Sequence, residues 1–197
     1  MTKFLFGTAL AVLAAAIPAA ATAQRIGPAV VAVVDTDRIS RECTACRAAA
    51  TQLQTQTNTL RTRAQQLQTQ LQTAGQPIQT AVNALNGKQP DAALQQRITA
   101  YQAQQSSAQQ ELARGEQNIR STQAHVNQQI GTRLGPIIST VAQARGATVA
   151  IDRGSALFAA PALDITNEVL AQLNQQLPTV SVTPLPQQQQ QQQPQGR

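Results

Sequence analysis

A seven-residue hydrophobic repeat runs through the middle of this 197-residue chain and constrains its fold more than any other feature. Small or apolar side chains recur at alternating spacings of four and three from Cys46 to Leu85, and again from Leu94 to Val126. A repeat of this period forms a stripe along one face of a helix, where a second helix covers it. The main stripe residues are Leu53, Leu60, Leu67, Leu71, Ile78 and Leu85, followed by Leu94, Ile98, Tyr101, Leu112, Ile119 and Val126.

The two stretches are predicted to be the arms of one antiparallel hairpin that covers residues 46–141. Its tip is expected at 86–90, where Asn-Gly is a strong turn signal. In such a hairpin, facing residues have position numbers with a constant sum, and a sum of 179 pairs stripe residues throughout, with Ala64 facing Gly115. Each arm would be about 60 Å long at 1.5 Å per residue. Because proline removes a backbone donor and clashes with the preceding turn, we expect a kink at Pro77.

The first 23 residues are predicted to be a secretory signal peptide. Lys3 supplies the positive start, residues 4–17 form an apolar stretch rich in Ala and Leu, and Ala21-Thr22-Ala23 is an A-x-A cleavage site. Cleavage between Ala23 and Gln24 would release the mature chain. The apolar stretch is short for a membrane span, so we expect a soluble, exported protein.

Short apolar segments on both sides of the hairpin predict three strands. They lie at 29–34, 147–151 and 156–160, and are rich in β-branched or small apolar residues. Asp164 is a candidate N-cap for a closing helix that ends near Leu177.

The expected fold class is therefore α+β, with a long helical hairpin projecting from a small β body. The body would be made of residues 24–45 and 142–177. From 178 to 197 the chain is rich in Pro and then Gln, so it has little to bury, and we expect this tail to be disordered.

Basic side chains are concentrated on the hairpin. Residues 44–141 carry eight basic and three acidic side chains, whereas the rest of the mature chain is neutral. A basic surface suggests nucleic acid, but export and an aromatic content of only 2% argue against that partner. Anionic lipid, lipopolysaccharide or acidic polypeptides suit an exported protein better, and simple solvation explains the charge equally well. Besides Arg47, the arm residues are Arg61, Arg63, Lys88, Arg97, Arg114, Arg120 and Arg133.

Cys43 and Cys46, the two cysteines of the chain, form a C-x-x-C pair where the first arm begins. A redox-active disulfide would need a thioredoxin-like order of strand and helix, which is missing here. A metal site would need more ligands, and His125 lies far along the hairpin. We therefore favour a structural disulfide, either within a chain or between subunits. Neither a Ser/His/Asp triad nor a pair of carboxylates is visible, so we expect no enzyme activity and no cofactor.

The order of these parts resembles the OmpH/Skp family of periplasmic chaperones. The clearest local match lies at the end of the body, where residues 147–159 look like the family's closing strand-turn-strand. Residues 164–170, Asp-Ile-Thr-Asn-Glu-Val-Leu, look like the family's D-I-T-x-x-V-L helix, and residues 30–35 look like its opening strand. The similarity covers roughly residues 29–177.

The resemblance implies a periplasmic homotrimer in which strands of three subunits form the β body. Three hairpins would then enclose unfolded outer-membrane proteins, prevent their aggregation and aid their delivery, without ATP. The arms here carry few charges, whereas those of the family's familiar member are crowded with Lys, so client capture by charge should be weaker and no lipopolysaccharide site is carried over.

Two other functions remain open. One is a structural coiled-coil spacer or adaptor of the cell envelope, although the roughly 20 residues before the first arm leave no room for the flanking domains of an efflux adaptor. The other is an envelope lipid binder that acts through the basic arms.

Overall fold

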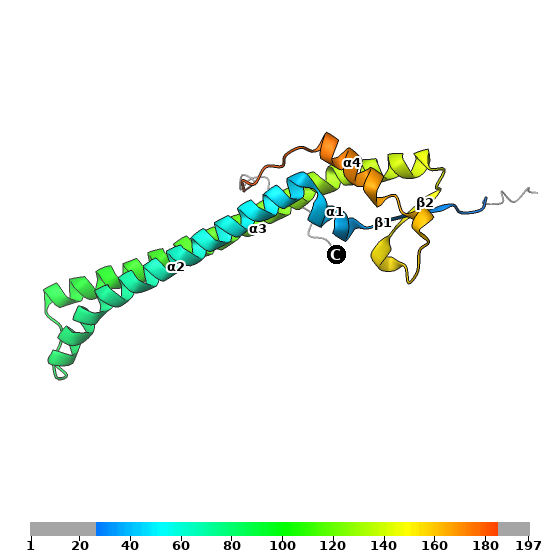
Figure 1. Ribbon diagram of the computed structural model, residues 1–197. Coiled ribbons are helices and arrows are strands. Elements are labelled where there is room, and N and C mark those ends of the chain that lie inside the picture. The colour runs from blue at the N-terminus through cyan, green and yellow to red at the C-terminus, as the bar shows by residue number, and fades with distance from the viewer. Residues whose placement is uncertain (1–26, 185–197) are drawn as a thin grey trace, which may run out of the picture.

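The structure is a computed structural model that describes residues 27–184. It consists of a long helical hairpin with a small body at one end (Figure 1). The signal peptide with its cleavage site at Ala23–Gln24, and the glutamine run that begins at Gln187, lie outside the described residues. None of the helices in the described part combines the length and the apolar character needed to cross a membrane.

The body is built from both ends of the described chain. Its two strands pair in parallel, with Val31 opposite Val149 and Val34 opposite Asp152. The elements of the body are β1 (Val31–Val34), α1 (Thr36–Glu42), β2 (Val149–Asp152), two short 3-10 turns (Arg153–Ser155 and Pro161–Leu163) and α4 (Thr166–Gln176).

The core of the body lies where β1 and α1 meet α4 and the last turns of the second arm. Ile39, Val169 and Leu173 are completely buried, and Val141 and Ile165 are nearly so. Each burial of a side chain of this kind contributes roughly 1.5–3 kcal/mol. These contacts hold the helix after the hairpin against the strand before it, so the two ends of the hairpin are fixed together.

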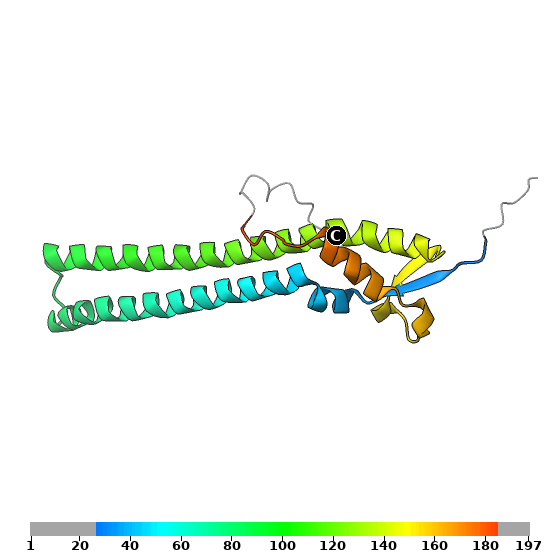
Figure 2. The same cartoon turned by 45° about the horizontal axis from the view of Figure 1, so that its top comes forward.

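The hairpin is formed by α2 (Thr44–Ala84) and α3 (Ala92–Ala144), which lie side by side in both views (Figures 1 and 2). At 1.5 Å per residue they are about 60 and 80 Å long. The turn between them contains Asn86 and Gly87, both with positive φ. The carboxylate of Asp91 caps α3 by accepting a hydrogen bond from the amide of Leu94 at 2.8 Å.

The register of the arms differs from the one predicted by a sum of 179. A Cβ atom at Gly115 would meet Leu60, and not Ala64, as its nearest neighbour. One at Gly75 would meet Tyr101. These pairs shift one arm past the other by three to four residues, about one helical turn. The arms are nevertheless joined through the expected stripes, and all twelve main stripe residues are buried or half-buried.

Helix α2 continues through Pro77 without a break. Figure 1 shows its last turns before the tip bending away from the line of the rest of the arm. Proline cannot donate a hydrogen bond and its ring crowds the preceding turn, so a bend at this place has a local cause.

The predicted third strand at 156–160 is wrong. After β2 the chain enters a 3-10 turn, and residues 156–160 pair with no strand of the described chain. Leu157 and Phe158 project outward, with 109% and 85% of their surface exposed. A strand needs a neighbour for its backbone groups, and β propensity alone does not supply one.

The prediction of a disordered tail from residue 178 is also wrong for residues 178–184. This segment, which we call the docked tail, leaves α4 and runs back over the hairpin toward the tip (Figure 2). Val180 and Val182 pack against the buried cluster of Ala49, Leu53 and Val126.

Candidate functional site

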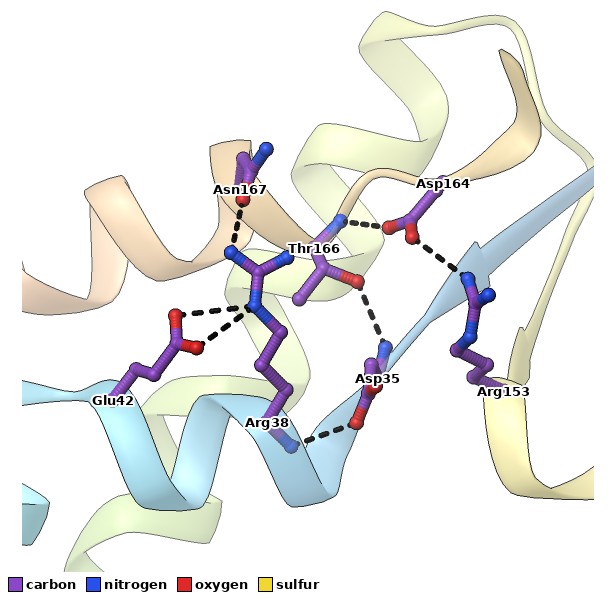
Figure 3. Close-up of polar contacts among 7 residues, drawn as sticks. All are labelled: Asp35, Arg38, Glu42, Arg153, Asp164, Thr166 and Asn167. Carbon is purple, nitrogen blue, oxygen red and sulfur yellow. Dashed lines mark hydrogen bonds and ion pairs between the residues drawn. The ribbon is translucent and has the colours of Figure 1, made fainter. Parts of the chain in front are cut away.

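A polar network joins α1, the helix that precedes the first arm, to the closing helix α4 (Figure 3). Asp35 caps α1 by accepting from the amide of Arg38 at 2.7 Å, and its own amide donates to the hydroxyl of Thr166 at 2.9 Å. Arg38 in turn pairs with Glu42 at 3.0 Å and donates to the side chain of Asn167 at 2.7 Å. The network therefore fixes α1 against α4.

The Asp-Ile-Thr motif at 164–166 is a structural joint. The amide of Ile165 donates to the carbonyl of Val33 at 2.9 Å, while Asp164 accepts from the amide of Thr166 at 2.8 Å and pairs with Arg153 at 3.0 Å. Partial burial raises the pKa of Asp164. The hydrogen bonds from Thr166 and the charges of Arg153 and Arg38 outweigh that effect, so the pKa of this carboxyl lies below its ordinary value.

Asp152 ties the end of β2 to the start of α1. Its carboxylate accepts from the hydroxyl of Thr36 at 2.5 Å and from the amide of Gly154 at 2.7 Å. The hydrogen bond from Thr36, followed by the one from Gly154, lowers the pKa of Asp152. The carboxylates that the sequence places at element ends thus hold the body together.

A disulfide links Cys43 and Cys46 within the chain at the corner between α1 and α2. Cys43 is completely buried and ends α1, and the amide of Thr44 beside it donates to the side chain of Asn174 on α4 at 2.8 Å. The corner where the arm leaves the body is therefore held by both a covalent bond and a tie to α4.

The basic residues of the arms are spread along the hairpin rather than gathered into one patch. Arg63 forms an ion pair across the arms with Glu111 at 2.6 Å, which raises the pKa of Arg63 and lowers that of Glu111 through their hydrogen bond. Arg120 lies 3.5 Å from Glu116 on its own helix. Within residues 27–184 no ion pair involves Arg61, Lys88, Arg97, Arg114 or Arg133.

The docked tail lies in a groove at the base of the hairpin, which we call the tail groove. Its floor is the apolar cluster of Ala49, Leu53 and Val126, with Ile130 beside it. Three side chains bind the backbone of the tail: Gln56 on α2, and His125 and Gln129 on α3. Sequence reasoning missed this site. The alternation of Val180 and Val182 with polar residues was the one signal that could have indicated it.

The body leaves an open sheet edge and several exposed apolar side chains. Within the described chain, β2 has β1 as its only sheet neighbour, and Val149 on β2 is 44% exposed. The exposed Leu157 and Phe158 follow β2 in the chain, and Val30, which precedes β1, is 48% exposed. Exposed edges and apolar groups of this kind are typical of surfaces that pair with another chain.

Within the described chain no cluster of three His, Cys, Asp or Glu side chains is arranged to hold a metal ion. His125 instead places its Nδ1 atom 3.3 Å from the carbonyl oxygen of Thr183. The structure therefore offers the contacts that fix α1 against α4, the projecting hairpin, the apolar edge of the sheet and the tail groove, which the docked tail occupies.

Comparison with known proteins agrees with this architecture. Residues 30–173, which include the body and both arms, match the family model described as outer membrane protein (OmpH-like). The chain belongs to the OmpH-like family. The expected resemblance is thereby confirmed.

A solved relative has the same fold. The structure superimposes with a TM-score of 0.67 on the crystal structure of a Caulobacter crescentus CB15 protein assigned as an OmpH-like outer membrane chaperone. The two are 22% identical, and the match covers 82% of this chain and 95% of the other. No curated protein matches the chain at a significant level.

Proposed function

We propose that this protein is an ATP-independent holdase chaperone of the periplasm, which binds unfolded outer-membrane proteins, prevents their aggregation and aids their delivery to the outer membrane. The observation that carries the proposal is the family match over residues 30–173, which extends through the body and both helical arms. The similar Caulobacter protein is itself assigned as an outer membrane chaperone.

The hairpin suits weak binding at many points. Its two helices share one narrow stripe, and shallow grooves remain beside it. One groove of about 400 Å³ is lined by Leu60, Ala64, Leu112 and Ile119 with polar neighbours. Surface Gln and Thr side chains offer hydrogen bonds without strong charge. Contacts of this kind can be made and broken without ATP, because each contributes little to the affinity.

We further propose that three copies assemble through the body. A two-stranded sheet is a weak structure in isolation. A neighbouring copy that adds to the open edge of β2 would cover Val149, and the exposed Leu157 and Phe158 would be buried in the same assembly. Three hairpins would then project from one body and enclose a client between them.

The test combines an aggregation assay with a measurement of mass. A urea-denatured outer-membrane β-barrel protein is diluted into buffer with and without the chain, and aggregation is followed by turbidity. We expect the chain to suppress aggregation as a trimer. A chain that assembles but leaves aggregation unchanged would favour a structural spacer, and suppression only in the presence of anionic lipid would favour the lipid binder.

A matched pair of variants links assembly to activity. Phe158→Asp changes a side chain that is 85% exposed on the body, so it should leave the fold of one chain intact while reducing the mass to that of a single copy. Val82→Asp changes a side chain that is 38% exposed near the tip, and should leave the mass unchanged. If Phe158→Asp keeps the trimeric mass, the proposed assembly surface is wrong.

A further inference from the structure

The polar side chains of the tail groove form hydrogen bonds with the backbone of the docked tail. The side-chain amide of Gln129 accepts from the amide of Ser181 at 2.9 Å and donates to the carbonyl of Ser181 at 3.0 Å. This double exchange is the one that a neighbouring strand makes in an antiparallel sheet. Gln56 donates to the carbonyl of Val182 at 3.0 Å, and His125 Nδ1 faces the carbonyl of Thr183.

None of these contacts uses a side chain of the docked tail. Every polypeptide carries the same backbone donors and acceptors, so the contacts of Gln56, His125 and Gln129 do not depend on the sequence of the bound segment. They require only that the segment is extended. The same logic operates wherever a peptide is bound by addition to a sheet edge.

The apolar floor of the groove selects for alternation. Val180 and Val182 are half-buried on the cluster of Ala49, Leu53 and Val126, whereas Ser181 and Thr183 between and after them face solvent. An extended chain presents successive side chains to opposite sides. The groove therefore fits a segment with apolar residues at every second position, which is the pattern of a transmembrane β-strand.

The groove continues past the end of the docked tail. A hollow of about 560 Å³ begins at Val182 and Pro184 and extends toward the tip between the arms, past Leu60 and Ile119. Its wall includes the Arg63–Glu111 pair. A segment longer than the docked tail can therefore lie in the same groove.

We infer that the tail groove is a binding site for extended segments of unfolded polypeptide with alternating apolar residues, and that residues 178–184 occupy it as an internal competitor. The inference rests on the proposed function for the class of client. To that proposal the inference adds the binding site and the conformation of the bound segment. It also explains how a client can be released easily, because the tail re-enters the groove when the client leaves.

Variants of the docked tail and variants of the groove test the inference in the full chain from Gln24 onward. The probe is a fluorescent peptide with the sequence of residues 178–184, followed by anisotropy, and then a denatured β-barrel protein. Val180→Ser with Val182→Ser weakens the tail but leaves the groove intact. We expect it to bind the probe about tenfold more tightly than wild type, the factor expected if the tail leaves the groove free about a tenth of the time.

Adding Gln129→Ala to that variant removes the double hydrogen bond and should reverse the gain. The matched control is Gln117→Ala. Gln117 is an exposed glutamine of α3 that lies between Gln129 and the tip, outside the contacts with the docked tail, and its replacement should change the affinity for the probe less than about twofold. A purely structural tail predicts the opposite pattern: the Val variants would lose stability with no gain in affinity. Equal affinity of the Val variant and wild type, or no effect of Gln129→Ala, overturns the inference.

Hydrogen exchange gives a readout without mutation. The amide of Ser181 donates to the side-chain oxygen of Gln129 at 2.9 Å, so we expect it to exchange slowly in the free chain. Saturating client should displace the tail and remove this protection, and unchanged protection would contradict the inference.

If wild type suppresses aggregation while these tests fail, the groove is not the client site but the proposed function stands. If the probe binds and aggregation is not suppressed, the groove stands and the proposed function fails.

Discussion

Replacing Thr166 by Val should destabilise the body by about 2 kcal/mol, roughly a 30-fold change in the unfolding equilibrium. Thr166 is completely buried, and its hydroxyl accepts the amide of Asp35 at 2.9 Å. Valine fills nearly the same volume, so the substitution creates no cavity. It leaves the partly buried amide of Asp35 without its partner at the junction of β1 and α1, and the loss of a partner by such a donor costs about 1–3 kcal/mol.

Thr122 provides a matched control for this substitution. It is also completely buried, but its hydroxyl donates to the carbonyl of Asn118 one turn earlier in α3, at 2.8 Å. That carbonyl is placed to accept a backbone hydrogen bond within the helix, so Thr122→Val should change stability by less than about 0.5 kcal/mol. Urea unfolding at one fixed protein concentration measures both variants. Equal losses for the two would refute the role assigned to Thr166.

Three further predictions concern the joint, the corner and the arms. Because the pKa of Asp152 is lowered in the folded protein, its carboxylate contributes fully to stability above about pH 4, and this contribution is lost as the pH falls through the folded-state pKa. In urea unfolding, Thr36→Val should therefore destabilise the protein more at pH 7 than at about pH 2. An equal effect at both pH values would contradict this. Reducing the disulfide, which closes a loop of about four residues, should lower the unfolding free energy by about 2 kcal/mol, and an unchanged urea midpoint would argue against its role. Under mild oxidation, Leu60→Cys with Gly115→Cys should cross-link faster than Ala64→Cys with Gly115→Cys, and the reverse order would restore the register with a sum of 179.

The helices of the hairpin and its tip follow from local patterns in the sequence. The stripe at Leu53–Leu85 and the one at Leu94–Val126 are each written in one stretch, as are the turn at Asn86-Gly87 and the cap at Asp91. Each depends on residues a few positions apart. Such features can be predicted because a helix or a turn brings near neighbours in sequence together in space.

The register of the arms depends on information that the repeat does not contain. Stripe residues alternate at spacings of three and four, so sliding one arm by three or four residues still sets about every second stripe residue opposite another. A sum of 179 pairs every stripe residue, but the repeat by itself does not exclude the sums of 175 and 176, which keep the two stripes in contact. Contacts such as Leu60 with Gly115 and Arg63 with Glu111 distinguish them, and these depend on the shape of the tip.

The misassigned segments depend on distant partners. Residues 156–160 have the composition of a strand, but the described chain offers them no neighbour. The docked tail has the composition of a disordered segment, but Gln56 and Gln129 lie more than 50 positions away and supply the groove that orders it. Composition describes what a segment can bury by itself, and both segments depend on what another element presents.

The most direct test of the account is the mass, by light scattering, of residues 24–197 alone and after mixing with a denatured outer-membrane β-barrel protein. The account predicts the mass of three copies for the chain alone, and a soluble complex of three copies with one client after mixing. A single-copy mass, together with a client that aggregates as it does in buffer, would contradict it.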